Sequence, residues 1–160
     1  MSVAFTKEDS AETASETMLP ARTISAEQNL VTEAGLQALD LQLNQARQAY
    51  EAACIVEDVN ERRRQAAIPL RDLRYFAERV RTAQLMPDLT STERIAFGST
   101  VSFRRNDGRL QKYRIVGEDE ADPKAGSISY VSPVARFLMG KAIGDVVSVG
   151  DQEIEILAIS

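Results

Sequence analysis

The fold is decided by a stretch in the C-terminal half of the chain, YRIVGEDEADPKAGSISYVSPVARFLMGKAIGDVV (residues 113–147). Its apolar and β-branched residues predict the end of one strand and then a short strand at Ile128–Val131. Ser132 and Pro133 predict a helix N-terminus, with Ser132 as the N-cap, and Gly140 predicts the end of that helix. A strand, a polar loop, a second strand and a helix in so short a stretch indicate a small α+β unit.

The flanking sequence extends this unit into a sheet. Two apolar runs, Val101–Arg105 and Leu110–Val116, are separated by Asn106-Asp107-Gly108 and predict a β-hairpin with a glycine-assisted turn. Two later runs, Val146–Val149 and Ile154–Ile159, predict the strands that close the sheet. Residues 88–160 therefore form a predicted α+β domain. The aromatic residues that we expect in its core are Phe97, Phe103, Tyr113 and Phe137.

Residues 29–87 carry a helical period instead. Apolar side chains recur at alternating steps of three and four residues, which is the spacing of one narrow seam along a helix. The first series is Leu36, Leu39, Leu43, Ala46, Tyr50 and Ala53, and the second is Ala66, Leu70, Leu73, Ala77 and Val80. Two narrow seams joined by a polar stretch predict an antiparallel coiled-coil hairpin, which would begin at an N-cap, Thr32, and end near Pro87. Because each seam covers the other, we expect a monomer.

The position of the hairpin tip depends on Pro69. If Pro69 lies inside a kinked second helix, the tip falls in the stretch 57–61 and is acidic. If Pro69 begins that helix, the tip moves to the stretch 62–68 and is basic. A proline inside a helix removes a backbone donor and costs roughly 3 kcal/mol. The acidic stretch lies near the midpoint of the hairpin, which favours the kinked helix and the acidic tip.

The composition excludes several classes of protein. The chain has 160 residues, a net charge of −5, 44% apolar and 27% charged residues, as globular proteins have. It has no histidine and one cysteine, Cys54, so histidine-based catalytic triads, histidine-ligated metals and internal disulfides are excluded. A single cysteine is typical of the reducing cytoplasm, and Cys54 lies beside the first seam, where we expect it to be packed. No apolar run reaches about 18 residues, so no membrane association is expected.

The charges are unevenly distributed along the chain. Residues 1–28 carry five acidic and two basic residues with few large apolar ones, which predicts a flexible tail. They also lack the basic and apolar regions of a secretory signal. Residues 29–87 hold eight acidic and eight basic residues, and every base is an arginine. The net acidity of the whole chain argues against a general nucleic-acid binder.

The sequence resembles the GreA/GreB family of bacterial transcript-cleavage factors. The resemblance rests on FGSTVSF (97–103) and on residues 113–147, in which YRIVGEDEAD, SP, AR, GK and GD follow one another in the family's order. The N-terminal side agrees, because LVTEAGLQALDLQLNQ (30–45) is similar to the start of the family's first coiled-coil helix. RDLRYFAERVRTAQLMP (71–87) resembles the end of its second helix, in the version found in GreB. Only the tail has no counterpart.

This resemblance implies a factor that binds bacterial RNA polymerase. In the family, an FKBP-like C-terminal domain docks on the rim of the polymerase secondary channel, and the coiled coil enters that channel. Tip carboxylates there help to hold a Mg²⁺ ion of the polymerase active centre, so that the polymerase cuts its own backtracked transcript. The factor would bind no cofactor itself, would not be an enzyme, and would meet DNA and RNA only indirectly through the elongation complex.

The resemblance also implies site residues. Carried over to this chain, the tip carboxylates are Glu57, Asp58 and Glu61, of which Glu57 and Asp58 would reach the shared Mg²⁺. The docking surface would include the acidic loop after the strand at 110–116 and the start of the short helix. Its expected residues are Glu118, Asp119, Glu120, Asp122, Ser132 and Pro133.

The chain departs from the family pattern at the tip. The stretch between the two matched helix ends is about two heptads shorter, which reduces the reach of the hairpin by roughly 10 Å. The family's pattern of an acid, two residues and then Glu-Asn-Ala is not intact, and Arg62-Arg63-Arg64 follows the carboxylates directly. These arginines would compete for the carboxylates or repel Mg²⁺.

Three functions are therefore compared. The first is stimulation of transcript cleavage through Glu57, Asp58 or Glu61. The second is a binding-only regulator, similar to the short-hairpin Rnk class, which occupies the channel without cleavage. The third is a prolyl isomerase, suggested by the FKBP-like fold. No tryptophan and no aromatic cluster marks a prolyl pocket, and a fold does not define a function. The first function is slightly favoured.

Overall fold

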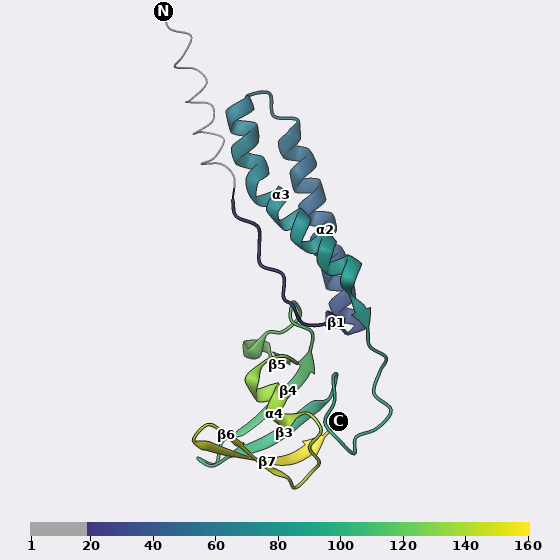
Figure 1. Cartoon of the computed structure of the whole chain (residues 1–160), viewed down its shortest axis with the longest axis vertical. Helices are drawn as coiled ribbons and strands as arrows, with labels where there is room; N and C mark the ends of the chain where they lie inside the picture. The colour runs from purple at the N-terminus through teal and green to yellow at the C-terminus, as the bar shows by residue number, and fades with distance from the viewer. Residues whose placement is uncertain (1–18) are drawn as a thin grey trace, which may run out of the picture. The chain divides into compact units, whose positions relative to one another are not determined.

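The structure is a computed structural model that describes residues 19–160. Its described residues divide into two compact units. A hairpin unit comprises 19–25 and 39–82, and a sheet unit comprises 26–38 and 83–160. The architecture is a helical hairpin followed by a small α+β domain, as the sequence predicts (Figure 1). Of the predicted tail, residues 1–18 lie outside the described residues, and residues 19–28 contain no helix or strand.

Two long helices form the hairpin. Helix α2 spans Glu33–Cys54 and helix α3 spans Val59–Thr82, and a loop of four residues reverses the chain between them (Figure 1). The first seam is confirmed, because its residues alternate between buried and half-buried positions. The second seam is correct at four half-buried positions and wrong at Ala77, which is exposed. The four are Ala66, Leu70, Leu73 and Val80. Cys54 is exposed rather than packed, because it lies in the last turn of α2.

The tip lies at residues 55–58, so the acidic-tip prediction is confirmed. Helix α3 runs through Pro69 without interruption, and the alternative in which Pro69 begins the helix is wrong. Proline cannot donate to the carbonyl one turn before it, and the packing of the surrounding apolar side chains compensates for this loss.

The second helix ends five residues before the predicted Pro87. After Thr82 the chain becomes extended, and strand β2 (Gln84–Leu85) pairs in parallel with strand β1 (Leu30–Val31). The amide of Gln84 donates to the carbonyl of Asn29 at 2.8 Å, and the amide of Met86 donates to the carbonyl of Val31 at 2.9 Å. The sequence did not predict this pair, because two-residue strands carry no periodic signal.

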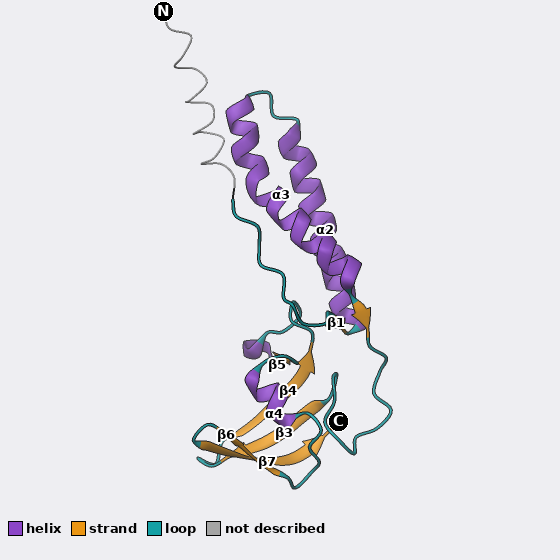
Figure 2. Cartoon of the chain, viewed as in Figure 1, coloured by secondary structure: helices purple, strands orange, loops and turns teal. Residues whose placement is uncertain are grey.

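The sheet of the second unit has five strands in the order β5-β4-β3-β7-β6 (Figure 2). Their bounds are β3 Thr100–Arg105, β4 Leu110–Val116, β5 Ser127–Ser129, β6 Val146–Val149 and β7 Gln152–Ile159. All neighbours are antiparallel except β4 and β5, which are joined through a 3-10 turn at Pro123–Ala125. The predicted turn at Asn106-Asp107-Gly108 is confirmed, and Gly108 adopts the positive φ of 84° that such a turn requires.

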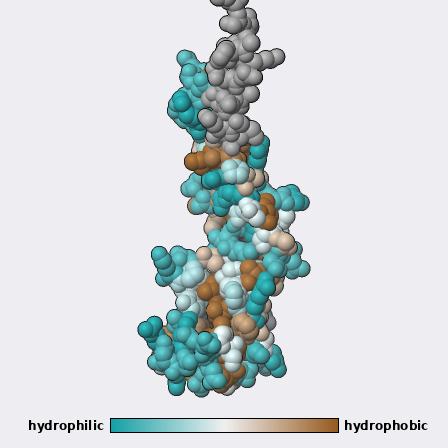
Figure 3. Space-filling model, turned by 60° about the vertical axis from the view of Figure 1, so that its left-hand side comes forward, coloured by the Kyte–Doolittle hydropathy of each residue, from teal (hydrophilic) through white to brown (hydrophobic). Residues whose placement is uncertain are grey.

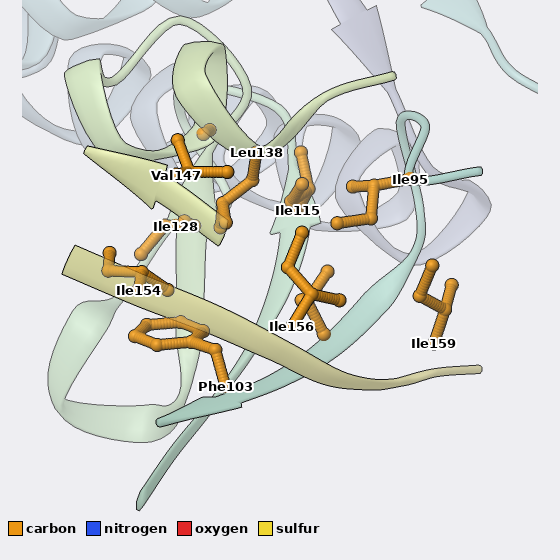
Figure 4. Packing of buried hydrophobic residues seen from close by; sticks show 11 residues of the cluster. Ile95, Phe103, Ile115, Ile128, Leu138, Val147, Ile154, Ile156 and Ile159 are labelled. Carbon is orange, nitrogen blue, oxygen red and sulfur yellow. The ribbon is translucent and has the colours of Figure 1, made fainter. Parts of the chain in front are cut away.

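The core of the sheet unit is a single apolar cluster (Figure 4). Phe103 and Ile156 come from neighbouring strands, and Ala135 and Leu138 come from the short helix α4 (Pro133–Leu138). Of the predicted aromatic core residues, Phe97 and Phe103 are buried and Tyr113 packs against the cluster. Phe137 is exposed, because the buried face of α4 is formed by Ala135 and Leu138 instead.

The face of the described residues that Figure 3 shows is mostly hydrophilic, with separate apolar patches. The most exposed large apolar side chain among the described residues is Ile55 at the hairpin tip, at 82%. No helix within residues 19–160 is both long and apolar enough to cross a membrane.

Candidate functional site

The hairpin tip is closed by hydrogen bonds from α3. Asp58 is the N-cap, because its Oδ1 accepts from the amide of Glu61 at 2.7 Å and its carbonyl accepts from the amide of Arg62 at 2.8 Å. The guanidinium of Arg62 donates to the carbonyls of Val56 at 2.8 Å and Glu57 at 3.0 Å. Arg62 therefore holds the loop itself, a role that the sequence analysis did not assign to it.

Glu61 is engaged by its own helix. Its Oε2 accepts two hydrogen bonds from the guanidinium of Arg64, at 2.8 and 3.1 Å, and its Oε1 accepts one from Gln65 at 2.9 Å. The competition predicted between arginines and tip carboxylates therefore occurs at this residue. The spacing of three between Glu61 and Arg64 is the sequence signal for it.

The tip offers one carboxylate that has no hydrogen-bond or ion-pair partner among the described residues. That carboxylate belongs to Glu57, whereas Asp58 is used as a cap and Glu61 is paired. Within residues 19–160, no group of three or more carboxylate, cysteine or histidine side chains is arranged to hold a metal ion. Whether Glu57 and Asp58 reach a Mg²⁺ ion of the polymerase stays a prediction, and one oxygen of Asp58 is already used by the cap.

Substitution Asp58→Ala tests the capping role. We expect a loss of about 1 kcal/mol in the free energy of unfolding, because the first turn of α3 loses its side-chain acceptor. Urea denaturation followed by circular dichroism measures this loss. The matched control is Glu57→Ala, which removes a carboxylate without a partner and should change stability by less than about 0.5 kcal/mol. Equal effects of the two substitutions would contradict the capping role.

The pKa of Glu61 provides a second test of the tip. The hydrogen bond from Gln65 lowers the pKa of the Glu61 carboxyl below its ordinary value, and the hydrogen bond and charge of Arg64 lower it further. Because the folded-state pKa is the lower one, this stabilisation is present above the unfolded-state pKa, about 4.3, and is lost as the pH falls through the folded-state value. We expect carboxyl carbon NMR to show the lowered pKa. Gln65→Ala and Arg64→Ala should each raise it, and an unchanged value in both would exclude the pairing.

The acidic loop of the sheet unit lies between β4 and β5. Glu120 accepts a hydrogen bond from the hydroxyl of Thr32, which in turn accepts from the amide of Gly35 at 3.0 Å. Thr32 is therefore the N-cap of α2, as predicted, and Glu120 places a negative charge at the positive end of that helix. Asp122 caps the 3-10 turn by accepting from the amide of Lys124 at 3.2 Å.

The other predicted docking residues lie on the same unit. Asp119 is exposed and Glu118 is half-buried, and both follow Gly117. Ser132 is the N-cap of α4 and accepts from the amide of Ala135 at 3.3 Å, with Pro133 at the first helical position. The predicted structural roles of Ser132 and Pro133 are confirmed, whereas their contact with a partner stays a prediction.

A feature that the sequence analysis missed fixes the start of this loop. A side chain at Gly117 would lie 2.4 Å from the carbonyl oxygen of Leu30, so only glycine fits where the end of β4 approaches β1. Near this point, Tyr130 donates to the carbonyl of Gln28, and Arg136 forms an ion pair with Glu27 at 2.9 Å. The segment before α2 is thus bound along the loop and α4.

The sheet domain matches a known family of proteins. Residues 90–160 match the family model described as "Transcription elongation factor, GreA/GreB, C-term". GreA of Methylobacterium nodulans is 40% identical over 116 residues, which cover 69% of this chain and 68% of that protein. GreB of Haemophilus ducreyi is 33% identical over 140 residues, which cover 78% of this chain and 86% of that protein.

The chain therefore belongs to the GreA/GreB family of transcription elongation factors. Among solved structures, the GreA factor homolog 1 of Thermus thermophilus aligns over 84% of this chain and 99% of that one. The identity is 23% and the TM-score is 0.40, a level from which nothing follows about function.

Proposed function

We propose that the chain binds bacterial RNA polymerase through its sheet domain and occupies the secondary channel with its hairpin, without stimulating transcript cleavage. The observation that carries this proposal is the use of the tip carboxylates. Asp58 uses one carboxylate oxygen to cap α3 and Glu61 is bound by Arg64 and Gln65, so Glu57 is the tip carboxylate with both oxygens unengaged among the described residues. A single exposed carboxylate does not supply the paired acidic ligands that a bridging Mg²⁺ requires.

Membership of the family supports the polymerase as partner, and the match of residues 90–160 supports the sheet domain as the docking element. We propose that Asp119, an exposed acidic residue near the start of this loop, contacts the polymerase. The chain would act as a monomer in the cytoplasm and would have no active site of its own.

The experiment that tests the proposal uses a stalled, backtracked elongation complex with Mg²⁺. We expect the protein to bind core RNA polymerase and to compete with a cleavage-active GreA, yet to leave the rate of RNA cleavage at that of the polymerase alone. Cleavage that the protein stimulates and that Glu57→Ala/Asp58→Ala abolishes would establish the cleavage function instead. Absence of binding to core polymerase would refute both functions.

The docking surface is tested in the same binding assay. Reversal of charge in Asp119→Arg should weaken polymerase binding about tenfold, because a rim charge then meets its partner with the wrong sign. The matched control is Asp151→Arg, which reverses an exposed charge in the turn between β6 and β7. Equal affinities of the two variants would place the docking surface elsewhere on the sheet domain.

A further inference from the structure

The hairpin unit contains a groove beside the segment that precedes it in sequence. Its volume is about 520 Å³, within the range of pockets that bind ligands. One side is lined by Leu19, Arg22 and Ile24, and the other by Tyr50, Ala66 and Leu70 of the two helices. The floor is apolar, and the function proposed above does not use it.

The segment on the first side is held by Arg22. Its guanidinium forms an ion pair with Asp72 at 3.3 Å and lies 3.9 Å from the centre of the Tyr75 ring. An arginine over an aromatic face is attracted to it by the ring quadrupole. The chain therefore runs along the hairpin at Arg22, and Leu19, the first described residue, lines the groove.

The described lining of the groove is rich in positive charge, because five of its residues are arginines and none is acidic. Helix α3 has seven arginines and three acidic residues, and the acidic ones pair with Arg64, Arg71 and Arg81. Arg63 and Arg74 line the groove and form no hydrogen bond or ion pair with any described residue. They are eleven residues apart, which places them on one side of α3 about 16 Å from each other.

The residues that precede Leu19 in the sequence have the complementary charge. Residues 1–18 carry one lysine and four acidic residues, a net charge of −3, whereas the described groove lining has five arginines and no acidic residue. Eighteen residues can span up to about 60 Å, so every part of the groove is within their reach. Because they are tethered at its edge, their effective concentration there is in the millimolar range.

We propose that residues 1–18 occupy this groove of their own chain, with acidic side chains on Arg63 and Arg74. The bound segment places acidic side chains beside the arginines of the groove and covers the apolar floor beside Leu70. It is an intramolecular ligand of the hairpin, distinct from the docking surface of the sheet domain. The proposal does not depend on polymerase binding, and the test below contains no polymerase.

The test uses the full chain with Cys54→Ser and with Ser10→Cys carrying a nitroxide label. Paramagnetic broadening of the amide NMR signals of Ala66, Ala67 and Leu70 reports the approach of the segment to the groove. Some broadening is expected without binding, because residue 10 is covalently linked to the hairpin unit. A variant in which the acidic side chains are neutralised measures this baseline broadening. That variant is Glu8→Gln/Asp9→Asn/Glu12→Gln/Glu16→Gln. We expect the unneutralised chain to lose at least twice as much signal as this baseline at low salt, and to approach it in 0.5 M NaCl.

Two further variants make the result specific. A matched control neutralises four exposed acids of the sheet unit to the same net charge, and it should keep the full broadening. It carries Asp88→Asn/Glu93→Gln/Asp151→Asn/Glu153→Gln. Arg63→Ala/Arg74→Ala should reduce the broadening to the baseline. Broadening at the baseline in the unneutralised chain, or undiminished broadening in the double arginine variant, would overturn the proposal.

The occupant is identified by mixing chains. One copy carries the nitroxide and no NMR isotope, and the other carries the isotope and no nitroxide. Any broadening in the mixture must therefore come from a second molecule. We expect none beyond that from random collisions. Strong broadening between copies would assign the groove to the segment of a second chain and would overturn the intramolecular proposal.

Discussion

Replacement of Gly117 by alanine should lower the free energy of unfolding by about 2 kcal/mol, and the thermal midpoint by roughly 10 °C. The new Cβ would lie 2.4 Å from the carbonyl oxygen of Leu30 and 3.6 Å from the Cα of Val31, both of them backbone atoms. Backbone held in the β1–β2 pair cannot move aside as a side chain can. Differential scanning calorimetry measures the change.

The control for this substitution is Gly35, whose close neighbour is a side chain rather than backbone. At Gly35 the added Cβ would meet the carboxylate of Glu120 at 2.2 Å, but that carboxylate is the far end of a flexible side chain. Gly35→Ala also gains up to about 1 kcal/mol of helix propensity, which offsets the loss of the contact between Thr32 and Glu120. We expect a net change below about 1 kcal/mol. A larger loss at Gly35 than at Gly117 would contradict the account of both sites.

The same substitution bears on docking. Gly117 is followed directly by the acidic loop, so a displaced β4 end should move Asp119 and weaken polymerase binding more than stability alone explains. Measurement of binding at a temperature well below the thermal midpoint separates these two effects. Unchanged affinity there would show that the position of the loop does not depend on the contact with Leu30.

Phe103→Ala should cost about 3–5 kcal/mol, the largest loss of stability that we expect from a single substitution. Phe103 is fully buried at the centre of the sheet, at 0% exposure, and its removal leaves a cavity that the strands on either side cannot close. For a domain with so small a core, this approaches the whole free energy of folding. Urea denaturation monitored by near-ultraviolet circular dichroism reports the loss.

An aromatic residue of the same kind provides the control. Phe137 lies on α4 and is 46% exposed, so Phe137→Ala should cost less than about 1 kcal/mol. Because α4 contributes Ala135 and Leu138 to the core, the helix remains in place in this variant. If Phe137→Ala lowered the free energy of unfolding as much as Phe103→Ala, the Phe137 side chain would have to be packed in solution rather than exposed.

Elements defined by neighbours in sequence were predictable. The turn at Asn106-Asp107-Gly108, the cap at Ser132 and the cap at Thr32 each depend on residue types within four positions. The seam of α2 was predictable because the helical period repeats over six positions. Pro69 was placed correctly within α3 because the acidic stretch lies near the midpoint of the hairpin.

The sequence predicted where the tip carboxylates lie, but not which hydrogen bonds they form. Glu57, Asp58 and Glu61 lie at or next to the reversal of the chain, as predicted. Which of them keeps a free carboxylate depends on hydrogen-bond geometry, and Arg62 turns toward the loop carbonyls while Arg64 binds Glu61. Residue types and spacing allow several such pairings of similar energy, and the folded backbone selects one of them.

The amino-acid sequence by itself determined the family, the two-part architecture and the local caps and turns, because these depend on short-range patterns and on a long ordered motif. Only the tertiary structure decided the β1–β2 pair, the need for glycine at 117, and the contact between Thr32 and Glu120. Each of these joins residues more than fifty positions apart. No local pattern records such a partner, since its energy is realised only once the chain has brought the two backbones together.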